Sequence, residues 1–291
     1  MGHQATHTVI QPVFTSLYLQ AVFDCTWLVL RPWLCCFNQA VGPFLPVTPE
    51  RSRPGRLWFG RLVLTPIYAV IALATLLPVL FVFVVRNFLH QFRQPYCEIK
   101  SIKCNIPTEV PKSTFSVATA NLCLLPEFMA KFNNLHKTAE RARKIGELIY
   151  TDQVHYQTFA QRYVNKRYSE GVNDRAGKDE TVTDTNNSLI TQDFNNEVIT
   201  HFPQTDFLCL QETFDADYTK QLLHELEKIY PYIVYDVGYS SPRVNYCGLS
   251  SGLCVASMYE IERIKFQPFS TKCGFCSIIG KGLVMLKVPK S

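Results

Sequence analysis

Two apolar stretches of the sequence end in polar side chains of the kind that bind hard cations. Asn121 lies in the string ATANL at 118–122, and Glu212 lies in the string FLCLQETFD at 207–215. Mg²⁺ prefers oxygen ligands and usually takes one or two from the protein, with water and phosphate completing the octahedron. Because α/β proteins gather their sites at strand ends, Asn121 and Glu212 could together hold such an ion. The same pattern also fits the plain edge of a core.

The cysteines and histidines form no motif that indicates a metal or catalytic site. Cys273 and Cys276 have CxxC spacing, but a zinc site needs a second ligand pair and none is suitably placed. We interpret the seven histidines as surface or helix residues, since none lies in a string typical of catalysis. The 11 cysteines are odd in number and no cleavable signal peptide is visible, so we expect reduced thiols that face the cytosol.

The strings that carry Asn121 and Glu212 have the composition of β-strands. The segments that combine β-branched or apolar residues with polar boundaries are 114–123, 207–211, 232–237, 252–258 and 282–288. Apolar periodicity predicts helices over 134–150 and 215–229. Strands that alternate with helices indicate an α/β layered core.

Several regions around this core are polar. In the helix expected over 134–150, we interpret Lys137, Arg141 and Lys144 as a solvated basic face. The segment at about 151–188 is poor in aliphatic residues and is expected to be an insertion in the domain 113–291. Residues 95–112 are expected to form a linker.

The N-terminal region, residues 1–94, has the composition of a membrane anchor. No charged residue lies between Leu62 and Val85, a length that would cross about 30 Å of hydrocarbon as a helix. Pro66 and Pro78 interrupt this segment. The earlier apolar segment, 13–37, carries charged residues that are costly at mid-bilayer, so we interpret it as re-entrant or interfacial.

The basic residues on both sides of 62–85 favour a hydrophobic hairpin that dips into one leaflet. A full crossing would leave one basic flank on the wrong side of the membrane. We therefore expect both ends of the chain to face the cytosol and the arginines to contact anionic phospholipids. A single spanning helix is the alternative. The pair Cys35 and Cys36 is suitably placed for palmitoylation, and buried unmodified thiols are the other interpretation.

The strings TANLCLLPE, NNL followed by a basic helix, DFLCLQETFD and SGLCVAS together resemble the neutral sphingomyelinases of the endonuclease/exonuclease/phosphatase superfamily. The paired N-terminal hydrophobic segments are similar to its membrane-anchored subgroup. The resemblance implies Mg²⁺ held by Glu212 with Asn121 nearby, as metal and catalytic residues. It also implies that Lys281, in a Gly-Lys-Gly string, contacts the substrate phosphate, although a turn lysine is an equal interpretation.

This resemblance also implies features that the sequence lacks. The family's general-base histidine, its aspartate and a GDFN-type string are absent, so we expect the first half of a four-layer α/β sandwich. Such a chain is predicted to be poorly folded in its soluble half and inactive by itself. Cys276 to Ile279 also replace the acidic residues that the family usually has before Lys281.

The function that follows is hydrolysis of sphingomyelin to ceramide and phosphocholine at a membrane surface. The plasma membrane, Golgi and endoplasmic reticulum all remain open as its location, and a homo-oligomer is possible. The alternatives are a non-catalytic, lipid-binding short isoform and another phosphodiesterase or nuclease of the superfamily. The modest net charge of +5 argues against a nucleic-acid partner.

Overall fold

The computed structural model describes residues 9–101, 114–171, 205–238, 250–271 and 280–289. The predicted CxxC pair lies outside these residues. The chain divides into one unit formed by Met1–Gly146 with Thr205–Ser291 and a second formed by Glu147–Gln204. The first unit carries the sheets and the apolar helices, and only this unit contains the candidate site.

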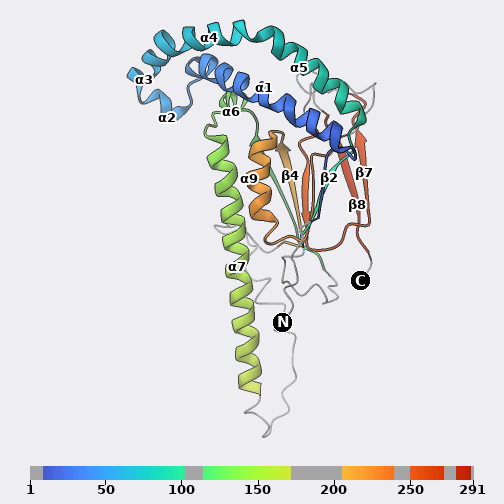
Figure 1. Cartoon of the computed structure of the whole chain (residues 1–291). Helices are drawn as coiled ribbons and strands as arrows, with labels where there is room; N and C mark the ends of the chain where they lie inside the picture. Colours follow the sequence, from blue (N-terminus) through green and yellow to red (C-terminus); the bar gives the residue numbers. More distant parts are fainter. Residues whose placement is uncertain (1–8, 102–113, 172–204, 239–249, 272–279, 290–291) are drawn as a thin grey trace, which may run out of the picture. The chain divides into compact units, whose positions relative to one another are not determined.

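The centre of the first unit is a six-stranded mixed sheet with the order β1-β2-β5-β6-β4-β3 (Figure 1). Its strands are β1 (Val9–Gln11), β2 (Cys97–Lys100), β3 (Val117–Leu124), β4 (Phe207–Thr213), β5 (Tyr232–Tyr235) and β6 (Cys254–Ser257). Strands β3 and β4 are parallel, and every other neighbouring pair is antiparallel. The α/β class expected from the sequence is confirmed.

Alternation along β4 explains which face of the sheet is covered. Leu208 and Leu210 are fully buried, as are Leu222 and Leu226 of helix α9 (Ala216–Leu226). Helix α9 packs on β4 and begins at Asp215, whose side chain caps its first turn. Leu208 and Leu210, two residues apart on β4, are therefore buried on the same side, as expected for a strand with one face under a helix.

The opposite face is only partly covered, by a two-stranded ribbon of β7 (Arg263–Pro268) and β8 (Gly282–Lys287). Alternate ribbon residues, among them Phe266 and Val284, pack against Val234 of β5. The other side of the ribbon stays exposed, with Leu283 at 51% and Met285 at 41%. The ribbon thus occupies the place of a second sheet layer over β5.

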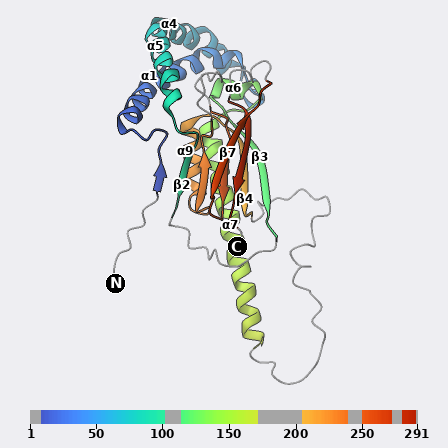
Figure 2. The same cartoon turned by 90° about the vertical axis from the view of Figure 1, so that its right-hand side faces the viewer.

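The apolar N-terminal region forms a set of helices. The long helix α1 (Leu17–Val41) packs along both α4 (Thr65–Ala74) and α5 (Leu76–Leu89). The corner between them contains the 3₁₀ turn η1 (Gly42–Phe44), α2 (Thr48–Arg51), α3 (Pro54–Phe59) and the π-helical segment η2 (Gly60–Leu64). The 3₁₀ turn η3 (His90–Phe92) ends the region. Figure 2 shows α1, α4 and α5 gathered at one end of the sheet.

The apolar segment expected at 62–85 is not one continuous helix. Helix α4 ends at Ala74, and Thr75 has φ −95° and ψ 3°, outside the helical range. Pro78 removes the backbone donor that would bond to Ala74 if the helix continued, which explains the break. The expectation of an interrupted segment is borne out by this break.

Other elements differ from the sequence expectation. Helix α7 (Thr138–Gly171) starts four residues later than expected and continues through 151–171, inside the segment expected to be an insertion. Residues 172–188 lie outside the described residues. The late start follows from Asn134 and Lys137, which have φ of 57° and 54°. Strand β2 lies within the expected linker, and helix α6 (Glu127–Phe132) and the short strand β1 were not expected.

Candidate active site

Asn121 and Glu212 lie at the same edge of the sheet. Strands β3 and β4 run parallel, with Asn121 opposite Gln211, so Glu212 is one residue beyond the paired position. The carboxyl ends of parallel strands meet at one edge of a sheet. The structure therefore brings together the two residues that the sequence proposed as cation ligands.

The backbone at this edge is irregular. Between Asn121 and Leu124, β3 advances three residues while β4 advances two, from Gln211 to Thr213, so β3 carries a bulge of one extra residue. Cys123 within the bulge has φ 50°, and Glu212 on the neighbouring strand has φ 59°. Left-handed conformations of non-glycine residues cost about 1–2 kcal/mol each and gather at functional sites.

Glycine supplies a third left-handed residue beside these two. Gly252, which precedes β6, has φ 68°, and its carbonyl accepts from the backbone N–H of Thr213 at 2.9 Å. A Cβ added to Gly252 would lie 2.6 Å from the ring of Phe214. The close approach of this ring explains why only glycine fits.

The side chain of Asn121 is held by the bulge. It is exposed, and its Oδ1 accepts from the backbone N–H of Cys123 at 3.0 Å. The carbonyl of Cys123 in turn accepts from Arg141 Nη2 at 2.6 Å. With one lone pair of Oδ1 engaged, Asn121 retains one carbonyl lone pair and two amide hydrogens for an ion or a phosphate oxygen.

The carboxylate of Glu212 has no competing partner in the part of the chain that the structure describes. The residue is half-buried, and none of the described residues forms a hydrogen bond or ion pair with its carboxylate. Its neighbour Gln211 is instead tied to Thr119 by a side-chain hydrogen bond of 2.7 Å. A free carboxylate at a strand end fits a hard cation that keeps most of its waters.

The described residues contain no group of three or more His, Cys, Asp or Glu side chains that could hold a metal ion. The oxygen donors of Asn121 and Glu212 do not suit structural zinc, which binds nitrogen and sulfur ligands in a closed tetrahedron. These two oxygen donors are compatible with Mg²⁺, which needs few protein ligands.

The remaining predicted site residues lie apart from this pair. Lys281 immediately precedes β8, is half-buried, and its carbonyl accepts from the N–H of Phe269 at 3.1 Å. No hydrogen bond or ion pair among the described residues joins Lys281 to Asn121 or Glu212. Cys35 and Cys36 lie in α1, where Cys35 is exposed and Cys36 is half-buried, and both are free thiols.

One charged pair at the same edge was not predicted from the sequence. Asp236 follows β5, has φ 49°, and forms an ion pair of 2.9 Å with Arg93, whose side chain is 5% exposed. The string YIVYD, a buried strand that ends in an acid, was the available signal. Because Arg93 neutralises it, Asp236 is engaged in structure rather than free to bind a cation.

Asp215 is a second acid close to the site. Burial raises its pKa, and the N–H groups of Tyr218 and Asp217 oppose that shift. Its own N–H donates to the carbonyl of Leu124 at 3.0 Å. Asp215 therefore connects the start of α9 to Leu124, the last residue of β3, shortly after the end of the strand that carries Glu212.

The apolar helices join the sheet at this same edge. Register places Gln11, the last residue of β1, beside Glu98 near the start of β2, and Cys97 opposite Tyr235 at the end of β5. The end of β5 lies beside the start of β6, which lies beside the end of β4. Both ends of the apolar region therefore enter the sheet at the edge that carries Asn121 and Glu212.

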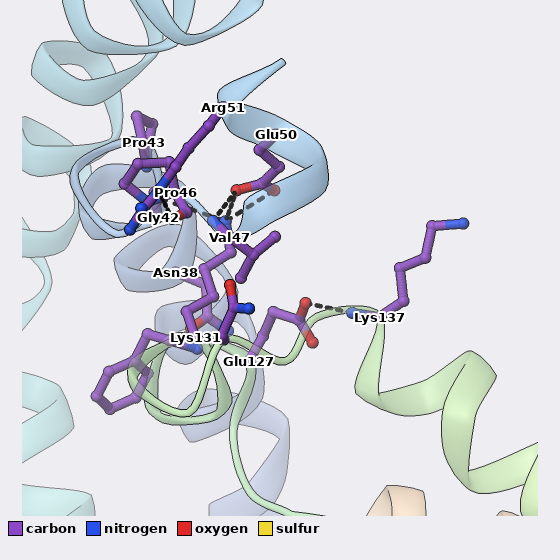
Figure 3. A network of polar contacts seen from close by, with 12 residues as sticks. Asn38, Gly42, Pro43, Pro46, Val47, Glu50, Arg51, Glu127, Lys131 and Lys137 are labelled. Carbon is purple, nitrogen blue, oxygen red and sulfur yellow. Dashed lines mark hydrogen bonds and ion pairs between the residues drawn. The ribbon is translucent and has the colours of Figure 1, made fainter. Parts of the chain in front are cut away.

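The corner of the apolar region also contacts the segment that follows β3 (Figure 3). Lys131 Nζ of α6 lies 3.0 Å from both carboxylate oxygens of Glu50 and donates to the carbonyl of Gly42 at 3.3 Å. The N–H of Phe128 donates to Asn38 Oδ1 at 3.0 Å. The Lys131 side chain is 11% exposed and that of Glu50 is 33% exposed, so this ion pair is partly shielded from water.

Comparison with known proteins identifies relatives over most of the chain. No family model matches. Sphingomyelin phosphodiesterase 5 of Danio rerio is 26% identical in an alignment 321 positions long that covers 92% of this chain and 58% of that protein. Sphingomyelin phosphodiesterase 3 of Homo sapiens is 38% identical over 98 residues, or 33% of this chain and 15% of that protein. The chain spans about half the length of the sphingomyelin phosphodiesterases 5 that it matches.

Solved structures show a partial likeness. A β-hairpin deletion mutant of β toxin from Staphylococcus aureus has a TM-score of 0.36 and 17% identity, covering 62% of this chain and 48% of that one. Sphingomyelinase C from Streptomyces griseocarneus has a TM-score of 0.27 and 26% identity, covering 31% and 34%. These scores are too low to add to the sequence comparison. That comparison confirms the resemblance expected from the motifs: the chain is similar to sphingomyelin phosphodiesterases over most of its length.

Proposed function

We propose that the chain is the membrane-anchored part of a Mg²⁺-dependent phosphodiesterase that hydrolyses sphingomyelin to ceramide and phosphocholine. The observation that supports this most is the position of the apolar helices. They enter the sheet at the edge where Asn121 and Glu212 lie, so a lipid surface that holds the helices would adjoin the candidate site. The named relatives are sphingomyelin phosphodiesterases, which supports the choice of substrate.

The residues of this chain would divide the work. Glu212 would hold the ion through its carboxylate, Asn121 would contact the ion or a phosphate oxygen, and Lys281 would meet the phosphate as a point charge. Bound Mg²⁺ would polarise the phosphodiester and stabilise negative charge on its oxygens. Among the histidines with described side chains, His90 is buried against Phe23 and His224 lies 3.3 Å from Glu227. We assign no general base among the described residues, and we propose that this chain does not hydrolyse the lipid by itself.

The apolar helices are proposed to lie in one leaflet without crossing the bilayer. Leu57–Ala74 is long and apolar enough to span, by length and composition, and only 11% of it is buried. However, β1 before α1 and β2 after α5 are neighbours in one sheet, and Glu50 in the corner pairs with Lys131 of α6. Each apolar segment thus has both ends tied to the same unit, which supports a hairpin over a single crossing.

Exposed arginines on the corner fit this arrangement. Arg51, Arg53 and Arg61 are exposed and would contact anionic headgroups on the cytosolic face. Protease treatment of sealed microsomes tests the topology. We expect a C-terminal tag and the corner at 46–61 both to be cleaved from the outside. Protection of either one while the other is cleaved would establish a spanning helix instead.

Palmitoylation of Cys35 and Cys36 would strengthen the anchor. The exposed thiol of Cys35 can reach an acyl donor, which favours modification over the buried alternative. Replacing both cysteines with serine is expected to abolish palmitate labelling in cells. Replacing Cys25, which is also exposed on α1, is the matched control. Unchanged labelling of the double variant would remove this part of the proposal.

Phosphocholine release from sphingomyelin vesicles with added Mg²⁺ tests the function. Sequencing the transcript past the Ser291 codon decides whether the chain continues, and any longer product is assayed beside the chain. In an active form we expect Glu212→Gln to lower the rate roughly a hundredfold, whereas Glu262→Gln, which removes an ion pair with Lys287, leaves it unchanged. Equal rates for both variants, or full activity in EDTA, would contradict the proposal.

A further inference from the structure

Cys123 adopts a backbone conformation that needs external support. It occupies the left-handed region at φ 50° inside the β3 bulge, a conformation that costs a non-glycine residue about 1 kcal/mol or more. Such strain persists only where surrounding contacts determine it. The contacts that hold Cys123 therefore also decide where Asn121, two residues earlier, is placed.

Every polar group of Cys123 is engaged. Its N–H donates to Asn121 Oδ1 at 3.0 Å, and its carbonyl accepts from Arg141 Nη2 at 2.6 Å. Its sulfur accepts from Asn133 Nδ2 at 3.4 Å. One residue, Cys123, thus separates the guanidinium of Arg141 from the amide of Asn121. Of these three contacts only the one from arginine is a charge-assisted hydrogen bond.

Arg141 is itself fixed in place by the start of α7. Glu127 accepts from the backbone N–H groups of Lys137 at 2.5 Å and Thr138 at 2.9 Å, which caps the helix (Figure 3 shows the Lys137 contact). Arg141 also donates from Nη1 to the carbonyl of His136 at 3.4 Å. The Glu127 carboxylate and the Arg141 guanidinium therefore hold the segment between β3 and α7 at two separate points.

The position of Arg141 is not explained by fold stability alone. Its Nε is buried and has no hydrogen-bond partner in the described residues, and leaving a buried donor unpaired destabilises a fold. Lys144 on the same helix and Lys137, which immediately precedes that helix, pair with Glu140 at the surface. Arg141 instead turns inward to the carbonyl of Cys123, so it has a role that its two basic neighbours do not share.

We propose that Arg141 is a positioning residue that fixes the backbone of Cys123 and, through the N–H of Cys123, the Asn121 side chain at the candidate ion and phosphate site. The assignment rests on the proposed function, because Asn121 needs a fixed position only if it binds an ion or a substrate. Lysine at this position would keep the charge but would lose the planar pair of donors that bridges Cys123 and His136.

The test combines hydrogen exchange with metal binding on the full chain in detergent. Exchange is followed in peptides that cover 119–126 and 207–213, and Mn²⁺ binding is followed by electron paramagnetic resonance as a probe for Mg²⁺. For Arg141→Met we expect exchange in 119–126 to accelerate about tenfold, exchange in 207–213 to stay the same, and the Mn²⁺ Kd to rise about tenfold. Arg141→Lys should lie between, and the exposed Arg143→Met should match the unsubstituted chain.

Three results would overturn the proposal: unchanged exchange in 119–126, acceleration in every peptide, or faster local exchange with an unchanged Mn²⁺ Kd. Acceleration everywhere would mean that Arg141 only stabilises the fold. Failure of the proposed function gives a different result. The unsubstituted chain would then bind no Mn²⁺, or would bind it with the same affinity as the Glu212→Gln variant. In that case exchange alone decides, and unchanged protection of 119–126 in Arg141→Met overturns the role of Arg141.

Discussion

Acidification from pH 7 to pH 5 is expected to weaken the packing of the apolar helices by charging His90. Burial, followed by the positive charges of Arg93 and Arg86, lowers the pKa of His90 to about 3. An unfolded chain takes up this proton near pH 6.5, so the unfolded state binds more protons between pH 6.5 and pH 3. Stability is therefore present above pH 6.5 and is lost progressively as the pH falls towards 3.

The loss at pH 5 can be worked from these values. The pH then lies 1.5 units below the unfolded pKa, and each unit corresponds to 1.36 kcal/mol, so the free energy of unfolding falls by about 2 kcal/mol. His90 is 8% exposed and packs edge-on to Phe23 with ring centroids 5.1 Å apart, so little of this is screened by solvent. A loss of this size is a large part of ordinary domain stability.

Urea unfolding in a non-ionic detergent, followed by tryptophan fluorescence, measures this loss. The reporters Trp27 and Trp33 lie in α1, the helix that packs on α5 just before His90. His90→Phe keeps an aromatic ring beside Phe23 and removes the titration. We expect this variant to lose about 2 kcal/mol less between pH 7 and pH 5 than the unsubstituted chain. An equal loss in both proteins would refute the reasoning.

Two further changes should also be measurable. Gly252→Ala should lower the free energy of unfolding by about 1–3 kcal/mol, because its Cβ would overlap the ring of Phe214 and its φ of 68° is left-handed. Gly55→Ala, where a Cβ meets nothing within 4 Å, is the control, and equal effects of the two changes would contradict the geometry. Lys131→Met leaves the carboxylate of Glu50 without its cation, so limited proteolysis should cleave the corner at 46–61 several-fold faster. An unchanged rate would show that the ion pair does not hold the corner.

Much of the fold could be predicted from local patterns. The strands at 207–213, 232–235 and 282–287 were expected within a few residues, since apolar runs with polar boundaries are a local signal. Strands β1 and β2 have three and four residues, and only long-range pairing defines them, so no local pattern could have identified them. The continuation of α7 was not predicted, because a segment with few aliphatic residues lacks the apolar periodicity that indicates a helix.

The identity of the site residues was predictable, but their geometry was not. Asn121 and Glu212 followed from the motifs, and the sheet brings them to one edge as expected. The left-handed backbone at Cys123 and Glu212 depends on contacts with residues far along the chain, which spacing does not encode. Arg141 was interpreted as part of a solvated face, because a helical pattern does not show which basic side chain turns inward.

Binding of Mn²⁺ to the chain, with and without Glu212→Gln, tests the central claim most directly. The claim is that a divalent cation binds where β3 and β4 end. Electron paramagnetic resonance should show one bound Mn²⁺ that Mg²⁺ displaces, with an affinity at least tenfold lower in Glu212→Gln and unchanged in Glu262→Gln. Equal affinity in all three proteins, or no binding to the unsubstituted chain, would contradict the account.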